Sequence, residues 1–212
     1  MGKPRLLDLF CGAGGASMGY YRAGFEVVGV DIKPQPHYPF EFHQADALTY
    51  PLEGFDAYHA SPPCQAYSKI TAIHRSYPYP DLLDAIRQRL EQTRKPYVIE
   101  NVPGSPLKAG LLLCGTMFGL RGKRNVIHRH RLFEANWPLP LSPASCCHQG
   151  KAMNVYTSGR NRRGTEREFI DGLGVPWAGT AVGLECIPPA YTQYIGKYLM
   201  QTIQGRLPLE VA

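Results

Sequence analysis

Residues 5–15 read Arg5-Leu6-Leu7-Asp8-Leu9-Phe10-Cys11-Gly12-Ala13-Gly14-Gly15. The apolar run at 5–10 predicts a buried strand, and the glycines after it predict a tight turn whose backbone can approach a ligand. Residues 16–23 can then form a helix that ends at Gly24, and residues 25–30 predict a second strand ending at Asp31. This order is typical of a nucleotide-binding βαβ unit. We therefore expect an α/β fold with a doubly wound, mostly parallel sheet.

The glycine turn favours a nucleoside ligand over a dinucleotide. The dinucleotide fingerprint places a third glycine at position 17, where this chain has Ser17, and it expects a pyrophosphate at the helix N-terminus. The departure argues against NAD and for a cofactor such as S-adenosylmethionine. The carboxylate of Asp31 could then accept hydrogen bonds from ribose hydroxyls.

Two further strands are predicted to end in chemically active side chains. Residues 41–45 form a short strand followed by Asp46, which stands either at a ligand or in a turn. Residues 55–60 lead into Ser61-Pro62-Pro63-Cys64-Gln65, where two prolines end the strand and stiffen the turn. A thiol at this place is positioned as a nucleophile would be, although free cysteines are usually small buried hydrophobes.

The second half of the chain is expected to complete the sheet and then become irregular. Asp81 caps a helix at 82–93, and the strand at 96–99 ends at Glu100, a carboxylate that is costly to bury unless it has a partner or a function. Arg129 and Arg131 alternate at strand period, which predicts that both point to one face. Residues 135–180 are predicted to be loops, and a last helix covers Tyr191 to Ile203.

Positive charge is concentrated in the middle of the chain. The net charge is +6 with a pI of about 9.0. Residues 101–165 hold ten basic side chains and one acidic side chain, Glu134. Such a local excess favours a surface that contacts phosphates over a merely solvated loop.

Length and composition predict one sizeable domain with a small appendage. The chain has 212 residues, of which 44% are hydrophobic and 19% charged. No apolar run is long enough to span a membrane, and the N-terminal residues lack a signal-peptide core. These features predict a cytoplasmic protein without a membrane partner, located in the host cytoplasm if a phage encodes it.

The cysteines are expected to be thiols. Cys146-Cys147-His148 is similar to part of a metal site, but a structural zinc needs four ligands and no second pair is evident from the spacing. The sequence therefore predicts no metal site.

Four motifs together resemble one family, the cytosine-C5 DNA methyltransferases. They are residues 8–15, residues 61–65, Glu100-Asn101-Val102 and Arg129-His130-Arg131, in the order seen in that family. The resemblance covers most of residues 5–135 and, more weakly, the C-terminal helix. It is strongest to compact, phage-type members with a reduced target-recognition region. It implies a Rossmann-like S-adenosylmethionine-dependent methyltransferase fold with a small irregular basic insertion.

The resemblance implies roles for individual residues. S-adenosylmethionine would be bound with Asp31 on the ribose and Asp46 on the adenine amino group. The full implied cofactor set is Phe10, Gly12, Gly14, Asp31, Ile32, Asp46, Ala47 and Pro63. The implied DNA-binding set is Gln65, Ser68, Asn101, Arg160, Arg162 and Arg163.

The implied catalytic residues are Cys64, Glu100, Arg129 and Arg131. A Cys64 thiolate adding to C6 of cytosine makes C5 nucleophilic, and Glu100 would hold the N3/N4 edge of the base. The arginines would support the base and favour the thiolate. In duplex DNA the cytosine must first be flipped out of the stack. The implied activity is that of a DNA (cytosine-5)-methyltransferase, expected to act as a monomer.

Two departures from the family pattern bear on this interpretation. Leu184 and Glu185 precede Ile187-Pro188-Pro189 where the family usually has Gly-Asn, and a carboxylate there would repel that of the cofactor. We expect a catalytic and cofactor-binding core at 1–134, a reduced recognition region at 135–180, and a C-terminal helix at 181–212 that packs back on the core. The short recognition region predicts short or relaxed sequence specificity.

Two other functions stay open at this point. The same chemistry could act on RNA or on free cytosine nucleotides, which the small recognition region favours and, for free nucleotides, the basic stretch disfavours. A protein that binds cofactor and nucleic acid without catalysis is the third hypothesis, motivated by Glu185 and opposed by the set of Cys64, Glu100 and Arg131.

Overall fold

A single sheet organises the described part of the chain, which comprises residues 2–64, 67, 81–108, 110–155 and 162–206 of the computed structural model. Its order is β3-β2-β1-β4-β5-β7-β6. The strands are β1 (Arg5–Leu9), β2 (Glu26–Asp31), β3 (Glu41–Gln44), β4 (Ala57–Ala60), β5 (Tyr97–Asn101), β6 (Leu111–Leu113) and β7 (Arg131–Ala135). Strands β1 to β5 are parallel to one another, and β7 runs antiparallel between β5 and β6. The predicted α/β, mostly parallel, doubly wound sheet is confirmed.

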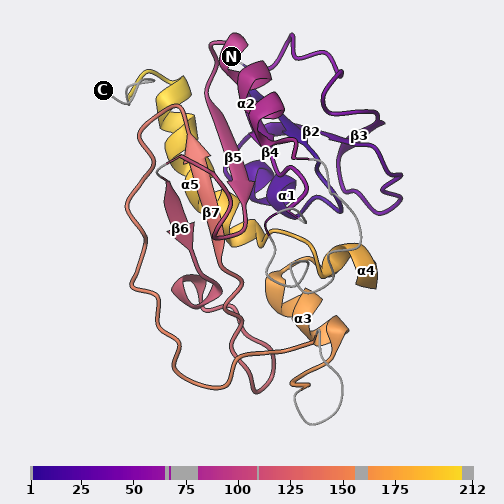
Figure 1. Ribbon diagram of the computed structural model, residues 1–212, viewed down its shortest axis with the longest axis vertical. Coiled ribbons are helices and arrows are strands. Elements are labelled where there is room, and N and C mark those ends of the chain that lie inside the picture. Colours follow the sequence, from indigo (N-terminus) through magenta and orange to yellow (C-terminus); the bar gives the residue numbers. More distant parts are fainter. Residues whose placement is uncertain (1, 65–66, 68–80, 109, 156–161, 207–212) are drawn as a thin grey trace.

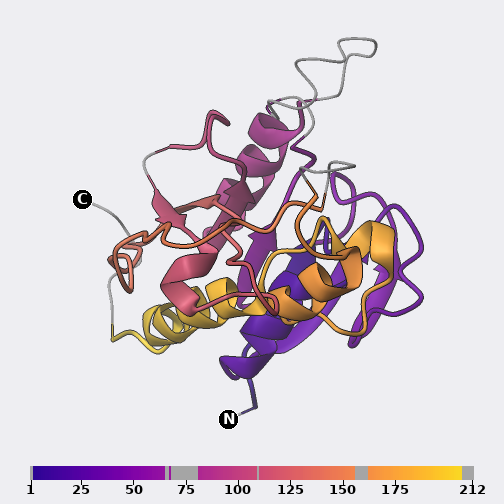
Figure 2. The same cartoon turned by 90° about the horizontal axis from the view of Figure 1, so that it is seen from below.

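Helices cover both faces of the sheet (Figures 1 and 2). The helical elements are α1 (Gly15–Arg22), α2 (Leu83–Gln92), η2 (Gly115–Phe118), α3 (Glu166–Leu173), α4 (Thr180–Gly183) and α5 (Pro189–Ile203). Helices α1 and α5 pack on one face of the sheet, and α2 packs on the other. Alternate residues of β1 separate the two cores: Leu6 packs with α1 and α5, whereas Leu7 and Leu9 pack with α2. This is the period of two expected of a strand buried on both faces.

Helix α5 closes the fold onto the first helix. A Cβ built on Gly19 would lie 2.0 Å from the Thr192 hydroxyl oxygen, so only glycine permits this approach. The Thr192 hydroxyl in turn donates to the Ala16 carbonyl at 2.8 Å. The C-terminal helix therefore braces the helix that follows the glycine turn.

A third cluster contradicts the expectation that residues 135–180 are all loops. Helix α3 spans Glu166–Leu173, and its Phe169, Ile170 and Leu173 are buried. They pack in a cluster that also contains Ala13 of the glycine turn. The Thr165 side chain accepts from the Glu168 backbone N–H at 3.1 Å, so a capping pattern starts this helix. No helix among the described residues is both long and apolar enough to cross a membrane.

Candidate active site

The turn after β1 has the strained backbone expected next to a ligand. Phe10, Gly12 and Gly14 have φ of 60°, 50° and 82°. A Cβ on Gly14 would lie 2.9 Å from a carbon of the Tyr38 ring, so both the dihedral angle and the space require glycine. A non-glycine residue at positive φ, as at Phe10, is typical of functional sites. These three implied cofactor residues are therefore brought to one turn.

Asp31 at the end of β2 lies against this turn. Its Oδ2 accepts from the Gly12 backbone N–H at 3.0 Å, and its Oδ1 accepts from the Lys33 backbone N–H at 2.9 Å. Ile32 beside it is 66% exposed. The carboxylate and the exposed apolar side chain thus stand together where an open α/β sheet binds ligands.

Asp46 follows β3 and is exposed. Its Oδ1 accepts from the Leu48 backbone N–H at 2.8 Å, and its carbonyl accepts from Thr49 and Tyr50. The turn role that was one of the two expectations for Asp46 is therefore present. Ala47 beside it is buried.

Asp8 lies in the middle of β1, and the sequence motifs assigned it no role of its own. It is completely buried, accepts a hydrogen bond from the Ser17 hydroxyl, and its Oδ1 has no partner among the described residues. The Ser17 oxygen also contacts the Tyr38 hydroxyl at 2.7 Å. Burial raises the pKa of Asp8 to about 7. A carboxylate within an apolar strand was the sequence signal for this group.

The turn that carries Cys64 is fixed by the strands on either side of β4. The Ser61 backbone N–H donates to the Leu9 carbonyl at 3.1 Å, and Asn101 Nδ2 donates to the Pro62 carbonyl at 3.1 Å. Asn101 is buried, so its structural bond explains this polar group without a ligand. Cys64 is half-buried at the end of the turn.

Glu100 and Arg131 form a nearly buried ion pair at the same edge. The Arg131 Nε lies 2.9 Å from Glu100 Oε1, with side-chain exposures of 13% and 6%. Burial raises the pKa of Glu100, while Arg131, a hydrogen bond from Ser61 and Arg129 all act to lower it. The carboxyl group is thereby held nearer to the protonated state than an ordinary glutamate.

The arginines favour the Cys64 thiolate as expected, but burial sets the net direction in which the pKa of this thiol moves. Burial raises the pKa of the Cys64 thiol, and the charge of Glu100 raises it further. Arg131 and Arg129 lower the pKa, as expected of cations, but burial outweighs them. Without substrate, the thiol form of Cys64 is therefore favoured more than in an ordinary cysteine.

The predicted strand alternation of Arg129 and Arg131 is wrong. Strand β7 begins at Arg131, whereas Arg129 has a φ of 35° and precedes the strand. Its guanidinium donates to the Cys186 carbonyl at 3.0 Å, and its own carbonyl accepts from the Tyr191 hydroxyl at 2.7 Å. Both arginines still act on Cys64 electrostatically, although they reach the site from different backbone conformations.

A buried hydrogen-bond chain links α1 to the Cys64 turn through His59 of β4. Tyr20 contacts His59 Nδ1 at 3.0 Å, and His59 Nε2 contacts Ser61 Oγ at 2.9 Å. Burial lowers the pKa of His59 to about 3, so the ring is neutral and has one donor and one acceptor nitrogen. The tautomer of His59 that accepts from the Tyr20 hydroxyl at Nδ1 donates to the Ser61 hydroxyl at Nε2, and the other tautomer reverses both bonds.

The remaining implied residues are only partly placed. Pro63 is half-buried in the Cys64 turn, and Arg162 and Arg163 are exposed. Arg163 pairs its backbone with Asn154 through hydrogen bonds of 2.8 and 3.1 Å. Gln65, Ser68 and Arg160 lie outside the described residues.

Comparison with known proteins supports the fold. No model of a protein family and no curated protein matches the chain. Among solved structures, the Dnmt2 methyltransferase of S. pombe is similar with a TM-score of 0.59 at 13% identity, over 95% of this chain and 99% of that chain.

Other solved structures are less similar, and two serve as examples. One is to a protein assigned as a DNA modification methyltransferase encoded within an E. coli prophage, with a TM-score of 0.44 at 20% identity over 62% of this chain. The other is to the Entamoeba histolytica methyltransferase EhMeth, with a TM-score of 0.45 at 15% identity over 68% of this chain. The chain spans 45% of the prophage protein and 58% of EhMeth. The sheet order and the similarity to the S. pombe enzyme together show the Rossmann-like fold of S-adenosylmethionine-dependent methyltransferases.

Proposed function

We propose that this chain is a DNA (cytosine-5)-methyltransferase with short or relaxed sequence specificity. One observation carries the proposal: the buried Glu100–Arg131 pair, 2.9 Å apart, acts electrostatically on the half-buried Cys64 thiol at the carboxyl edge of the sheet. A thiol, a carboxyl group of raised pKa and a cation are the groups that covalent activation of a pyrimidine needs. The likeness in fold to the S. pombe Dnmt2 methyltransferase points in the same direction.

The first turn of the fold fits S-adenosylmethionine. A Cβ on Gly12 would meet only a Val182 carbon at 3.8 Å among the described residues, Asp31 has acceptor capacity beyond its two backbone bonds, and Ile32 presents an exposed apolar surface for a base. We propose that Gly12, Asp31 and Ile32, with Phe10, Gly14, Asp46, Ala47 and Pro63, hold the cofactor. When bound, it supplies an electrophilic methyl group.

The chemical roles of the chain's own residues follow from their environment. Cys64, once deprotonated, adds to C6 of cytosine, and the electron pair of the C5–C6 bond moves to make C5 nucleophilic. Glu100, with its raised pKa, can hold a proton toward N3 and stabilise the adduct. Arg131 keeps Glu100 oriented. After substitution at C5, loss of the C5 proton restores the double bond and releases the Cys64 thiolate.

The proposed substrate is a cytosine flipped from duplex DNA, bound by a protein monomer. The basic bias of residues 101–165 supports a nucleic-acid partner. We propose that Gln65, Ser68, Arg160, Arg162 and Arg163 contact the DNA, whereas Asn101, which is buried, holds the Cys64 turn. We also propose that residues 1–134 form the catalytic and cofactor-binding core, that 135–180 form the reduced recognition region, and that 181–212 brace the core.

Methylation mapping tests the proposal directly. A plasmid expressing the chain should carry 5-methylcytosine detectable by bisulfite sequencing, and Cys64→Ala should abolish it. Cys147→Ala is the matched control because Cys147 is exposed and should be dispensable for the chemistry. Methylation by Cys64→Ala at the level of the unmodified chain would exclude the covalent mechanism.

A second experiment separates the substrates and the non-catalytic hypothesis. Purified protein is offered duplex DNA, tRNA and dCMP with labelled S-adenosylmethionine, and 5-fluorocytosine DNA serves as a covalent trap. Transfer to duplex DNA and a Cys64-dependent trapped complex are expected. Transfer only to tRNA or dCMP would move the assignment to RNA or nucleotides, and binding without transfer or trapping would leave a non-catalytic protein.

A further inference from the structure

Four side chains from distant parts of the chain bring two sulfurs and two imidazole nitrogens together. Cys114 directly precedes η2, His130 directly precedes β7, and Cys146 and His148 lie in the coil between β7 and α3. One ligand atom from each residue lies within 4.8 Å of all the others. We call these four residues the Cys2His2 cluster. The coil that carries two of them passes the short helix after β6 (Figure 1).

The distances in the cluster suit a tetrahedral metal ion. His130 Nε2 lies 3.3 Å from Cys146 Sγ, and His148 Nε2 lies 3.6 Å from Cys114 Sγ and 2.8 Å from Cys146 Sγ. Zinc bonds of about 2.3 Å to sulfur and about 2.0–2.1 Å to nitrogen give sulfur–nitrogen edges of about 3.5 Å. Two of the three contacts have this length, and the third is shorter.

The surroundings orient the ligands before any metal binds. The Gly115 backbone N–H, next to Cys114, donates to the His128 carbonyl at 2.5 Å, which draws the Cys114 loop to the segment that carries His130. The His128 ring stacks on His148 with centroids 4.0 Å apart and planes 15° apart. Cys114 is fully buried, so the cluster is anchored on the core side.

The coil that supplies Cys146 and His148 buries little of its own surface. All ten residues from 141 to 150 are exposed, and none belongs to a helix or strand. Leu141 is 90% exposed and is held through its carbonyl by the Tyr194 hydroxyl at 2.6 Å. A stretch that buries so little apolar surface cannot offset its loss of conformational entropy by packing. A metal bond network at Cys146 and His148 would supply that free energy.

We propose that the Cys2His2 cluster is a structural zinc site. Two thiolates and two imidazoles are the ligand set that zinc prefers, and four protein ligands leave no open position for a substrate. The site joins the η2 region, the start of β7 and the coil at 141–150. It lies outside the proposed catalytic groups and does not depend on what reaction they perform.

The metal site would also help to position Arg131 beside Glu100. The catalytic meaning of this link rests on the proposed function. His130 stands between Arg129 and Arg131, and its carbonyl accepts from Arg131 Nη1 at 2.8 Å while Arg131 Nε pairs with Glu100. A metal that fixes His130 therefore fixes the carbonyl that orients Arg131. Loss of the metal should loosen this support even in a chain with no methyltransferase activity.

Metal content tests the site without any activity assay. The full chain, purified without chelators and desalted, should retain one zinc per chain by elemental mass spectrometry. Cobalt exchanged into the site should give the visible absorption of tetrahedral cobalt together with sulfur-to-cobalt charge transfer. Zinc affinity, measured by chelator competition, should fall at least about 100-fold in Cys146→Ser and in His148→Asn, since losing only an outer-shell partner already costs 10–100-fold.

Cys147→Ser is the matched control because it alters the neighbouring exposed thiol, which is outside the cluster. It should keep one zinc and full affinity. Cys146 and His148 are exposed, so their variants should keep the core, which circular dichroism checks. Three outcomes would each overturn the proposal: less than a tenth of an equivalent of zinc after incubation with excess zinc, equal loss in Cys147→Ser, or a native Cys114–Cys146 disulfide found by mass spectrometry. Failure of methylation with zinc bound would count only against the proposed function.

Discussion

The reactivity of the single residue Cys64 tests the candidate site, because charges of opposite sign act on its thiol. Burial and Glu100 raise the pKa of its thiol, and Arg131 and Arg129 lower it. Only the thiolate reacts with iodoacetamide, so the alkylation rate should rise with pH along a limb displaced to the alkaline side of an ordinary cysteine. Glu100→Gln should move this limb to lower pH, and Arg131→Gln to higher pH, each by about one unit or more.

Opposite shifts of the pH–rate limb in Glu100→Gln and Arg131→Gln would distinguish an electrostatic effect from a loosening of the Cys64 turn. Increased exposure of Cys64 would move both variants in the same direction, toward lower pH. Arg131→Lys keeps the positive charge and should leave the limb close to its original position. Mass spectrometry of the Cys64 peptide after timed labelling gives the rate at each pH. Shifts of the same sign in both glutamine variants would contradict the assigned ion pair.

The raised pKa of Asp8 predicts that the free energy of unfolding depends on pH. Its pKa rises from the ordinary 3.8 to about 7 in the folded chain because it is buried. Between these pH values the folded chain keeps a proton that the unfolded chain has lost, so stability falls as pH rises through this window and levels off above it. A shift of about three units corresponds to at most about 4 kcal/mol.

Asp8→Asn should remove this contribution while keeping an acceptor for the Ser17 hydroxyl. Urea unfolding at intervals from pH 4 to pH 8 measures the difference between the two proteins. The variant should gain stability relative to the unmodified chain as pH rises. Parallel stability curves over the whole range would show that Asp8 ionises normally in the folded protein.

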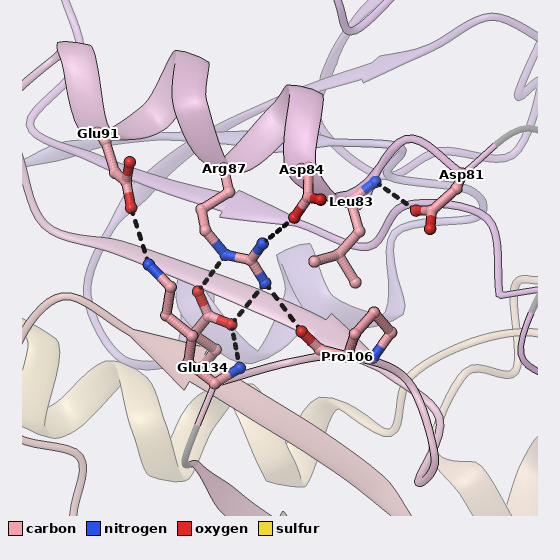
Figure 3. A network of polar contacts seen from close by, with 8 residues as sticks. Asp81, Leu83, Asp84, Arg87, Glu91, Pro106 and Glu134 are labelled. Carbon is pink, nitrogen blue, oxygen red and sulfur yellow. Dashed lines mark hydrogen bonds and ion pairs between the residues drawn. The ribbon is translucent and has the colours of Figure 1, made fainter.

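A buried ion pair fastens α2 to β7 at the scale of secondary-structure elements (Figure 3). Arg87 donates to Glu134 through Nε at 2.7 Å and Nη2 at 2.9 Å, and also contacts Asp84 and the Pro106 carbonyl. Glu134 accepts from the Lys108 backbone N–H at 2.7 Å as well. Glu134, the one acidic side chain in residues 101–165, is thus used inside the fold and does not neutralise the basic surface.

Breaking this pair from one side should be strongly destabilising. Glu134→Ala leaves the Arg87 guanidinium buried without its main partner and should cost about 3–5 kcal/mol in chemical denaturation. The double variant Arg87→Met, Glu134→Gln should lose less unfolding free energy than Glu134→Ala. It leaves no unpaired charge buried, and the introduced amide oxygen can still accept from the Lys108 backbone N–H. The exposed Glu91–Lys108 pair is the control, and Glu91→Ala should cost at most about 1 kcal/mol. Equal losses in Glu134→Ala and Glu91→Ala would contradict this account.

Elements that have a clear apolar run or repeat, or that are bounded by glycine, proline or a capping residue, could be predicted from the sequence. The glycine turn, the strands before Asp31 and Cys64, and the helix after Asp81 lie within a residue or two of their expected bounds. Helix α3 was missed although Thr165-Glu166-Arg167-Glu168 has the form of a capping box and Gly174 ends the helix in a left-handed conformation. Local composition rich in arginine and glycine obscured those signals.

The meeting of side chains that lie far apart in the sequence could not be predicted. Cys114 and His130 are far in sequence from Cys146, so their spacing shows no metal motif until the sheet brings the start of β7 beside the end of β6. The positive φ of Arg129 and the net rise in the pKa of Cys64 likewise depend on packing by distant residues. A motif specifies which groups are present, whereas burial decides their protonation.

At the scale of the whole molecule, the late part of the chain closes over the first turn. Trp177 Nε1 donates to the Ala13 carbonyl at 2.8 Å, and a Cβ on Gly15 would lie 2.2 Å from the Ile187 carbonyl oxygen. The proposed recognition region is therefore anchored on the proposed cofactor turn through α3 and the segment after it. Glu185 is exposed at this closure. Nucleic acid bound by the basic region would accordingly be held relative to the cofactor turn.

This arrangement predicts a specific salt dependence of DNA binding. Arg162 and Arg163 are exposed, and each phosphate contact they make should contribute about −0.9 to the slope of log K against log salt. The double variant Arg162→Gln, Arg163→Gln should make the slope less negative by about 2 and weaken binding to all duplex sequences alike. Arg22→Gln with Lys197→Gln removes the same charge from exposed positions on α1 and α5 and should leave the slope nearly unchanged. Fluorescence anisotropy across a salt series measures both; an equal change in slope for the two pairs would show that net charge, and not a basic recognition surface, drives binding.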